Sequence, residues 1–546
     1  MRPSINKPHI PPSSFWSSSL NLVLFLVIPL VVFLVLVSAL TPEPSTLSPW
    51  TWRFGNLVSH SFGFSPPSLI EETPTNISDF KAHTNNSTVI KGSSIFNGSS
   101  TDSSFLDAEP DYFASNRSFS AAFIEKETVQ LQAMSKNNES EEIDVTSTTR
   151  VVKRYSKLER LEANLARARS SIKEAALVRN LTSIHQNHDY VPHGPIYRNS
   201  NAFHRSYLEM EKLFKIYVYQ EGEPPIFHNG PCRSIYSSEG RFIHELEKGK
   251  FYRTQDPDEA LVYFLPFSVV MLVHYLYDPE TFDTDAIGRA VVDYIDVIAS
   301  NHPYWNRSLG ADHVMLSCHD WGPRASSYVP HLYHKSIRVL CNANTSEGFN
   351  PAKDASFPEI NLLTGDVEGL LGGPSPSRRS ILAFFAGRLH GYIRYLLLNE
   401  WKDKRDPDVQ VFDQLPKGVS YMSKLKNSRF CLCPSGYEVA SPRIVEAIYA
   451  ECVPVLISDS YVPPFSDVLN WNSFSVQVAA KDIPNIKKIL MSISQRRYLR
   501  MQRRVKQVQR HFVVNATPKR YDVFHMITHS IWLRRLNIHV QDFDHS

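Results

Sequence analysis

Two glutamates surround the start of a predicted helix in the segment YEVASPRIVEAIYAECVPVLISD, residues 437–459. Glu438 and Glu446 stand eight positions apart, with Ser441 and Pro442 between them. Serine is a preferred N-cap and proline suits the first helical position, so we expect a helix to begin here. The free N–H groups and the dipole of such a helix end favour an anion, above all a phosphate.

The side chains around this helix start could bind the successive parts of one ligand. Arg443, in the first turn, can add a charge-assisted hydrogen bond to phosphates. Glu446, one turn further on, can accept two hydrogen bonds from a ribose diol, and Glu438 can reach hydroxyls of the group attached to the phosphates. Diol, diphosphate and sugar in a row describe a nucleotide-sugar, so we expect a donor site at Glu438, Ser441, Arg443 and Glu446.

A second candidate for the same site lies in LAFFAGRLHGYIR, residues 382–394. An apolar strand ends here at Gly387, and a glycine-bearing loop lets backbone approach a diphosphate closely. Arg388 or Arg394 could neutralise the charge that develops on a leaving group.

The elements that must position these residues are short apolar strands that alternate with helical segments. Two sets of strand-like runs stand on either side of a Gly/Pro/Ser-rich break at residues 369–380: 214–219, 260–267, 313–318 and 337–343, then 381–387, 409–412, 429–434, 453–458 and 474–478. Continuous apolar strands separated by helices predict parallel sheets that are covered on both faces. We therefore predict an α/β protein with two doubly wound, Rossmann-like domains, residues 187–372 and 373–546, which face a cleft where ligands bind at the carboxyl ends of the strands.

The segments before these domains predict a membrane anchor and a stem. Leu20–Leu40 carries no charge over 21 residues, which is enough helix to cross a bilayer, and basic residues precede it. A cleaved signal peptide ending near Val37-Ser38-Ala39 is the alternative. We expect a cytosolic tail (1–19), a signal-anchor helix (20–40), a polar stem (41–150) and a helical segment (151–186) that forms either a short coiled stalk or a helix packed on the body.

Glycosylation sequons support a lumenal position for everything after the anchor. The candidate sites are Asn76, Asn86, Asn97, Asn116, Asn138, Asn180, Asn306 and Asn344. Six cysteines also lie in the predicted body, where disulfides can form, although their pairing cannot be read from sequence. Cys431 and Cys433, two apart in a strand, share one face and are poorly placed to bridge each other.

Composition and charge exclude some classes of function. Lys plus Arg number 58 and Asp plus Glu 55, a net charge of +3, which is too small to argue for nucleic acid. There is no Cys-x-x-Cys pair, so a zinc site is not expected. No Asp-x-Asp pair follows an apolar strand, and the helix end and arginines can carry the charge of a diphosphate, so we expect no essential metal.

Several long motifs resemble one protein family. They include KIYVYQEGEPPIFHNGPC, PYWNRSLGADHVMLSCHDWGP, LAFFAG and FCLCPSGYEVASPRIVEAIYAECVPVLISDSYVPPFSDVLNW. The chain resembles, from about residue 187 to 537, the exostosin-like proteins of glycosyltransferase family 47, in particular the plant group that contains the xylogalacturonan xylosyltransferase. The Glu438–Glu446 spacing also matches the E-x7-E signature of many transferases with the GT-B fold.

The resemblance implies a function and a location. It implies a single-pass type II Golgi membrane protein with a lumenal GT-B body that transfers a sugar, with inversion, from a UDP-sugar to a pectin or hemicellulose acceptor. Relatives often carry glycine at the position of Arg388, which favours Arg394. The alternative is a non-catalytic partner subunit in a complex with other glycosyltransferases.

An inverting transfer needs a base that takes the proton of the acceptor hydroxyl. Asp320, in SCHDWGP, directly follows a predicted strand and would lie at the carboxyl edge of the first sheet. His319 beside it and His228, in IFHNGPC, are the alternatives.

Overall fold

The computed structural model describes residues 156–177 and 190–541. The predicted tail, anchor and stem, and the sequons from Asn76 to Asn180, lie outside these ranges. Within them, no helix is both long and apolar enough to span a bilayer. The anchor predicted at Leu20–Leu40 therefore stays a prediction.

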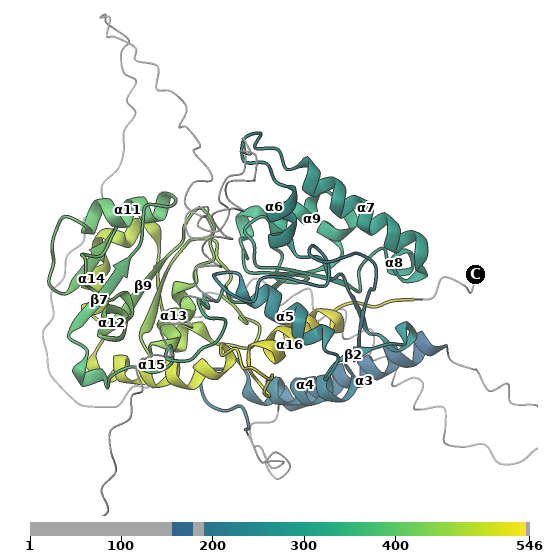
Figure 1. Ribbon diagram of the computed structural model, residues 1–546. Coiled ribbons are helices and arrows are strands. Elements are labelled where there is room, and N and C mark those ends of the chain that lie inside the picture. Colours follow the sequence, from purple (N-terminus) through teal and green to yellow (C-terminus); the bar gives the residue numbers. More distant parts are fainter. Residues whose placement is uncertain (1–155, 178–189, 542–546) are drawn as a thin grey trace, which may run out of the picture. The chain divides into compact units, whose positions relative to one another are not determined.

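Six parallel strands form the first sheet, in the order β2-β1-β3-β4-β5-β6 (Figure 1). They are β1 Ile216–Val218, β2 Arg253–Thr254, β3 Val262–Phe264, β4 His313–Ser317, β5 Ile337–Leu340 and β6 Ala355–Ser356. Every residue of β1, β3, β4 and β5 is buried, because helices cover both faces of the sheet.

Five parallel strands form the second sheet, in the order β11-β10-β9-β7-β8. They are β7 Ile381–Ala386, β8 Val409–Phe412, β9 Ser428–Pro434, β10 Val453–Ile457 and β11 Val476–Val478. The prediction of two parallel α/β sheets is confirmed, and all nine predicted strands are present. The two strands that were not predicted, β2 and β6, are edge strands of two residues each, too short to show an apolar run.

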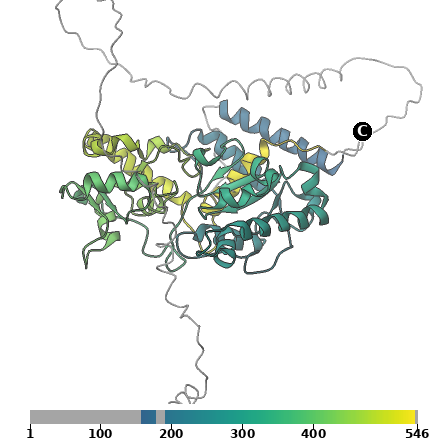
Figure 2. The same ribbon diagram turned by 90° about the horizontal axis from the view of Figure 1, so that it is seen from above.

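Helices follow the strands in both halves. We call residues 200–356 the first lobe and residues 381–508 the second lobe. The first lobe contains α4 Ser200–Leu213, α5 Ser237–Glu247, α6 Val269–Leu276, α7 Asp285–Asn301, α8 Pro303–Ser308, α9 Gly322–Ser327 and α10 Pro330–His334. The second contains α11 Tyr392–Trp401, α12 Tyr421–Lys426, α13 Arg443–Tyr449, α14 Ile486–Met491 and α15 Gln495–Val508. The green second lobe lies beside the teal first lobe in both views (Figure 2).

Helix α3, Lys157–Leu177, packs against α4 of the first lobe. Leu165 is fully buried in this contact, and Glu162 forms an ion pair with Arg535. Of the two interpretations of residues 151–186, the structure shows the helix packed on the body for the part that it describes.

The last helix, α16 Val523–Leu536, returns to the first lobe. It contacts α4, β5 and β6, and Figure 1 shows it in yellow near the blue α4. Arg534 fixes it there, because its Nε donates to the backbone oxygen of Asp354 at 2.9 Å. The predicted boundary at residues 372 and 373 separates the two sheets, but the end of the chain contributes its helix to the first of them.

Candidate active site

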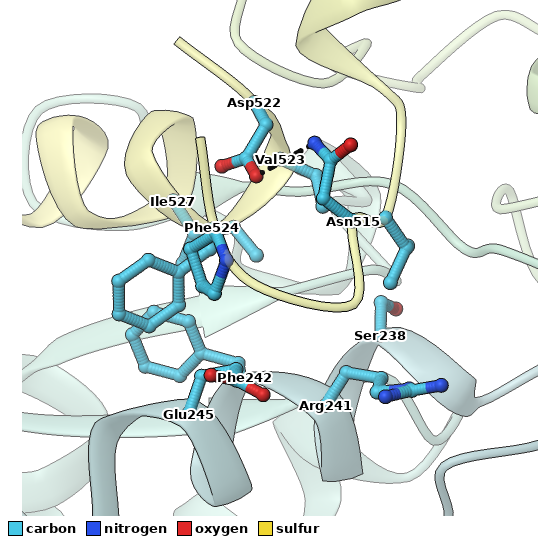
Figure 3. Close-up of a pocket in the computed structure, with 11 residues that line it drawn as sticks. Ser238, Arg241, Phe242, Glu245, Asn515, Asp522, Val523, Phe524 and Ile527 are labelled. Atoms are coloured by element: carbon cyan, nitrogen blue, oxygen red, sulfur yellow. Dashed lines mark hydrogen bonds between the residues drawn. The ribbon is translucent and has the colours of Figure 1, made fainter. Parts of the chain in front are cut away.

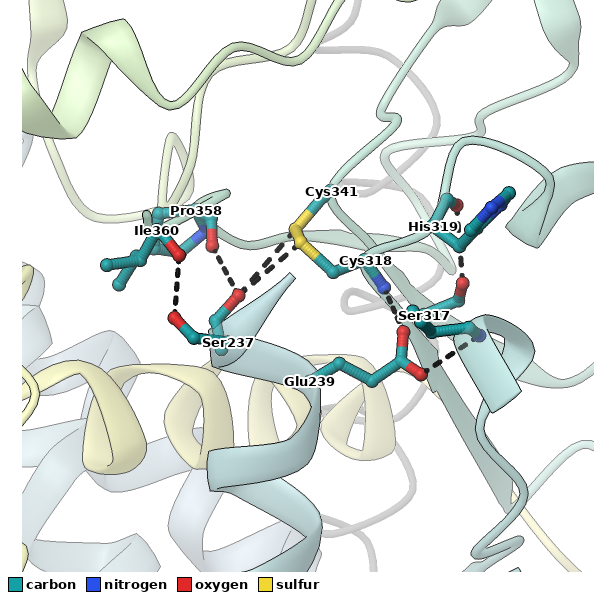
Figure 4. The surroundings of a disulfide bond; sticks show 10 residues. Ser237, Glu239, Ser317, Cys318, His319, Cys341, Pro358 and Ile360 are labelled. Atoms are coloured by element: carbon teal, nitrogen blue, oxygen red, sulfur yellow. Dashed lines mark hydrogen bonds between the residues drawn. A yellow bond between two sulfur atoms is a disulfide. The ribbon is translucent and has the colours of Figure 1, made fainter. Parts of the chain in front are cut away.

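The first part of the candidate site is the loop that follows β4. A disulfide between Cys318 and Cys341 joins this loop to the end of β5, with the two Cα atoms 4.6 Å apart. Buried Glu239, from α5, accepts a hydrogen bond from the Cys318 N–H at 2.6 Å and another from Ser268 (Figure 4). A covalent tie and a buried carboxylate therefore hold the backbone directly before His319 and Asp320.

Asp320 is partly buried at the carboxyl edge of the first sheet, as its position after a strand predicts. Burial raises the pKa of its carboxyl group to about 7, the charge of Glu347 acts in the same direction, and Arg394 opposes them. A carboxylate that titrates near neutral pH is suited to act as a general base, because it is ionised yet basic enough to take a proton.

The pKa of the His319 ring is shifted in the opposite direction to that of the Asp320 carboxyl group. Burial lowers its pKa to about 4, so the ring is neutral near pH 7. Its Nδ1 accepts a hydrogen bond from the Trp321 N–H at 3.0 Å, which places the ring proton on Nε2. His319 can therefore donate a hydrogen bond from Nε2, but in this arrangement it offers no lone pair to a substrate proton.

Both ring nitrogens of His228 already have hydrogen-bond partners. Its Nδ1 lies 2.8 Å from Glu247 Oε1, and its Nε2 lies 3.2 Å from the backbone oxygen of Glu221. The bond to Glu247 raises the pKa of the ring. Both nitrogens are engaged and the ring favours its charged form, so the prediction of His228 as an alternative base is not supported.

Glu438 reaches from the second lobe to the first. Its Oε2 accepts a hydrogen bond from Asn342 Nδ2 at 2.7 Å, and the same amide nitrogen lies 3.0 Å from the backbone oxygen of Asp320. Burial, together with the charges of Asp320 and Glu347, raises the pKa of Glu438 well above its usual range. Asn342 thus links the loop that carries Asp320 to the loop that carries Glu438.

Glu359 was not predicted, but it lies close enough to Asp320 and the two arginines Arg394 and Arg443 for their charges to act on it. It comes shortly after β6, the last strand of the first lobe, and is 7% exposed. Burial, and then the charge of Asp320, raises the pKa of its carboxyl group, whereas Arg394 and Arg443 oppose the shift. The signal that could have found it is its position after a strand, but β6 is too short to be recognised in the sequence.

Two neighbouring arginines, Arg394, which is buried, and Arg443, which is partly buried, form the basic side of the site. Burial and then the charge of Arg443 lower the pKa of Arg394 to about 9. Among the residues that the structure describes, neither the Nε of Arg394 nor that of Arg443 has a hydrogen-bond partner. Arg443 Nη2 donates to the backbone oxygen of Ala386 at 3.2 Å. Two neighbouring cations at least partly removed from water make a site that favours an anion.

Two glycines leave room for the guanidinium groups of these arginines. A Cβ atom on Gly387 would collide with Arg443 Nη2, and one on Gly436 would lie 3.2 Å from Arg394 Nη2. Gly387 thus lies in the basic site, as predicted, although what it accommodates in this structure is a guanidinium group.

The start of α13 differs from the prediction. The helix begins at Arg443, Pro442 occupies the N-cap position, and no side chain caps it. Ser441 is 3% exposed, and its Oγ finds no partner in the described part of the chain. Pro442 has helical dihedral angles and the Ser441 side chain makes no capping hydrogen bond, so the prediction of Ser441 as the cap was wrong. Its unpaired hydroxyl remains available to a ligand.

Glu446 lies one turn into α13 and has two neighbours. Tyr421, the first residue of α12, donates to its Oε2 at 2.7 Å, and Asn361 donates to its Oε1 at 3.4 Å. Each carboxylate oxygen can accept a second hydrogen bond, so the pair that we expect from a ribose diol remains possible. Arg388, by contrast, is exposed and contributes to none of these contacts.

The two sequons in the described ranges that were predicted as glycosylation sites differ in exposure. Asn306 is exposed on α8. Asn344 is 5% exposed, and its amide donates to Glu347 Oε1 at 2.9 Å. A glycan on Asn344 would have to displace this buried contact, so the structure argues against that site.

Neither a cluster of metal ligands nor a small pocket elsewhere in the described ranges adds to this site. In residues 156–177 and 190–541, no three metal-ligating side chains lie close enough to hold a metal ion. A small pocket lies between α5 and the segment before α16, where Asn515 Nδ2 donates to Asp522 Oδ2 at 3.0 Å (Figure 3). None of the predicted site residues lines this pocket.

Comparisons with known proteins agree on one family. A family model described as the exostosin GT47 domain matches residues 210–493. A probable glycosyltransferase of Arabidopsis thaliana is 58% identical over 417 residues, which cover 76% of this chain and 80% of the relative. A second from the same plant is 60% identical over 382 residues, or 69% of this chain and 81% of the relative. A probable glucuronosyltransferase of Oryza sativa subsp. japonica is 29% identical over 266 residues, 45% of this chain and 61% of the relative.

Proposed function

Because the chain belongs to the exostosin GT47 family of glycosyltransferases, we propose that it transfers a sugar, with inversion, from a UDP-sugar to a cell-wall polysaccharide of the pectin or hemicellulose type. What we propose beyond the family membership is the UDP-sugar donor, the polysaccharide acceptor and the inversion at the transferred sugar. A non-catalytic partner subunit would have no use for the arrangement of charges described above.

The observation that carries the proposal is the pair of neighbouring arginines, one buried and one partly buried. The charge of Arg443 acts on Arg394, both Nε atoms are unpaired within the described part of the chain, and Arg443 lies against Gly387. A diphosphate would neutralise both guanidinium groups and satisfy these donors. The family relationship favours the diphosphate of a nucleotide-sugar over other anions.

The expected reaction follows from the positions of the charges. Asp320 takes the proton from the acceptor hydroxyl, whose oxygen forms the new bond to C1 of the donor sugar. The bond between C1 and the phosphate oxygen breaks, and its electron pair leaves with UDP. Arg394 and Arg443 stabilise the charge that develops on the leaving phosphate. Attack from the first lobe and departure into the second lobe give inversion.

The remaining site residues position the substrates. Glu446 accepts hydrogen bonds from the ribose diol, supported by Tyr421, and Glu438 binds hydroxyls of the transferred sugar. With its raised pKa, Glu438 is protonated near neutral pH and can donate a hydrogen bond as well as accept one. We propose that the enzyme needs no metal, because the arginines supply the charge that a cation would otherwise supply.

We also propose that the body lies in the Golgi lumen behind an N-terminal anchor. Two disulfides, Cys318–Cys341 and Cys431–Cys452, support this, because disulfides persist in oxidising compartments. The uncharged segment Leu20–Leu40 supports the anchor.

The test is a binding and transfer assay with the full chain. Calorimetry with UDP compares Arg394→Ala and Arg443→Ala with Arg388→Ala, which removes an exposed arginine. We expect each of the first two to weaken UDP binding about 10- to 100-fold, the worth of one charge-assisted hydrogen bond, and the third to change it less than about twofold. Asp320→Asn should keep UDP binding and lose transfer from every UDP-sugar that the parent uses. Equal UDP affinity in all three arginine variants would refute the donor site.

A further inference from the structure

A group of exposed apolar side chains lies beside the candidate active site. We call Leu389, Tyr392, Tyr395 and Tyr437 the tyrosine platform; their exposed fractions are 61%, 69%, 50% and 57%. In the described part of the chain only one other tyrosine, Tyr275, is as exposed. Exposed apolar groups that gather in one place, and are not scattered singly, commonly mark a binding surface.

The platform is built from two segments that are held together. Tyr392 and Tyr395 lie one turn apart on α11, with ring centroids 6.5 Å apart and an interplanar angle of 22°. Tyr437 comes from the loop between β9 and α13, and its ring meets that of His390 edge-on at 4.6 Å. Gly391 joins the segments: its φ is +88°, and a Cβ atom there would collide with the Gly436 carbonyl group. Only glycine fits this close approach.

The platform continues directly from the candidate active site. Helix α11, which presents Tyr392 and Tyr395 to solvent, also carries buried Arg394. Tyr437 immediately precedes Glu438, the residue that contacts Asn342 beside Asp320. A ligand that extends outward from the reacting groups would therefore pass over these tyrosines.

The chemistry of the platform suits a chain of sugar rings. A pyranose ring has a C–H face that packs flat on an aromatic ring and a rim of hydroxyls that hydrogen-bonds. Tyrosine offers both an apolar ring face and a polar O–H, with little conformational entropy to lose. Two such rings with centroids 6.5 Å apart can contact neighbouring sugars of one chain.

We propose that the tyrosine platform binds the acceptor polysaccharide, with sugar residues beyond the reacting hydroxyl stacked on Tyr392, Tyr395 and Tyr437. This inference rests on the proposed function, because it assigns the acceptor of the same active site. It also implies that long acceptors are preferred over short ones, since a disaccharide held at Asp320 would not cover the platform.

The experiment measures glycan binding and transfer separately. The full chain, Tyr392→Ala/Tyr395→Ala and Tyr437→Ala are titrated with galacturonan and xylan oligosaccharides, as disaccharides and as longer chains, without any UDP-sugar. We expect the parent to bind at least one of the longer chains, and the double variant to bind it about tenfold more weakly. UDP affinity should stay unchanged. In transfer assays, KM for the long acceptor should rise while KM for the donor stays the same.

Matched variants separate stacking from loss of structure. Tyr392→Phe/Tyr395→Phe keeps the rings and should keep most of the affinity. Tyr275→Ala removes an equally exposed tyrosine from α6 and should have no effect. The proposal is overturned if the double alanine variant binds the long chain as the parent does, if it loses UDP affinity in parallel, or if no chain binds and the variant instead loses self-association or binding to lipid vesicles. UDP binding without any transfer would count against the proposed function alone, because the oligosaccharide titration does not depend on catalysis.

Discussion

Replacing Asp320 by asparagine should abolish transfer and stabilise the fold at alkaline pH. The carboxyl pKa rises from 3.8 to about 7 on folding, so between these values the folded protein holds a proton that the unfolded chain has lost. The free energy of unfolding therefore falls as pH rises from about 4 to about 7. Asparagine does not titrate, so the variant escapes this loss.

The size of the effect follows from the pKa shift. A shift of about three units is worth about 4 kcal/mol at 1.36 kcal/mol per unit, for a group fully removed from water. Asp320 is only partly buried, and solvent screens part of its interaction, so we expect about 2 kcal/mol. The stability difference between Asp320→Asn and the parent should grow by nearly this amount from about pH 4 to pH 8.

Denaturant unfolding of the full chain at several pH values measures this difference, with Asp296→Asn, an exposed change on α7, as the control. The control difference should stay within about 0.5 kcal/mol across the range. If the Asp320→Asn difference is flat with pH, or if the variant becomes relatively less stable as pH rises, the raised pKa and the assignment of Asp320 as a base near neutrality are both wrong.

Three further expectations concern the chemistry of the same site. The rate of transfer should rise with pH through an apparent pKa near 7, because Asp320 must be ionised to accept a proton, and a rate that falls over pH 6–8 would contradict this. Gly387→Ala should weaken UDP binding at least about tenfold by pushing Arg443 aside, whereas Gly418→Ala, in an open turn, should leave UDP affinity unchanged in calorimetry. Dialysis against EDTA should leave transfer intact; activity that vanishes and returns with added Mn²⁺ would show that a metal is needed.

Sequence reasoning found the features that depend on local patterns. Apolar runs identified the nine strands that are longer than two residues, and position after a strand identified Asp320 and the loop around Glu438. Arg394 and Gly387 were found in the same way. The strand predictions are confirmed because the burial of a strand and its place in a parallel sheet depend on the types of consecutive residues, whereas the roles of the site residues stay predictions.

The missed features depend on contacts between distant segments. Glu359 follows a strand with too few residues to be recognised, and Tyr421 meets Glu446 only through the fold of the second lobe. The bond between Asn342 and Glu438 joins residues 96 positions apart. The partners of Cys318 and Cys431 likewise required the tertiary structure. The partners of the His228 ring, Glu247 and the backbone oxygen of Glu221, also could not be recognised in the sequence.

The return of α16 to the first lobe means that the chain passes between the lobes twice, around residues 357–380 and again around residues 509–522. A polypeptide that stops before Val523 would lack the helix that contacts β5 and β6, and one that starts at residue 373 would carry that helix without α4, β5 and β6. We therefore expect that neither half folds as an independent fragment. The two segments that connect the lobes also restrict how far the lobes can separate when substrates enter. This favours a small rocking motion of the lobes over a wide opening.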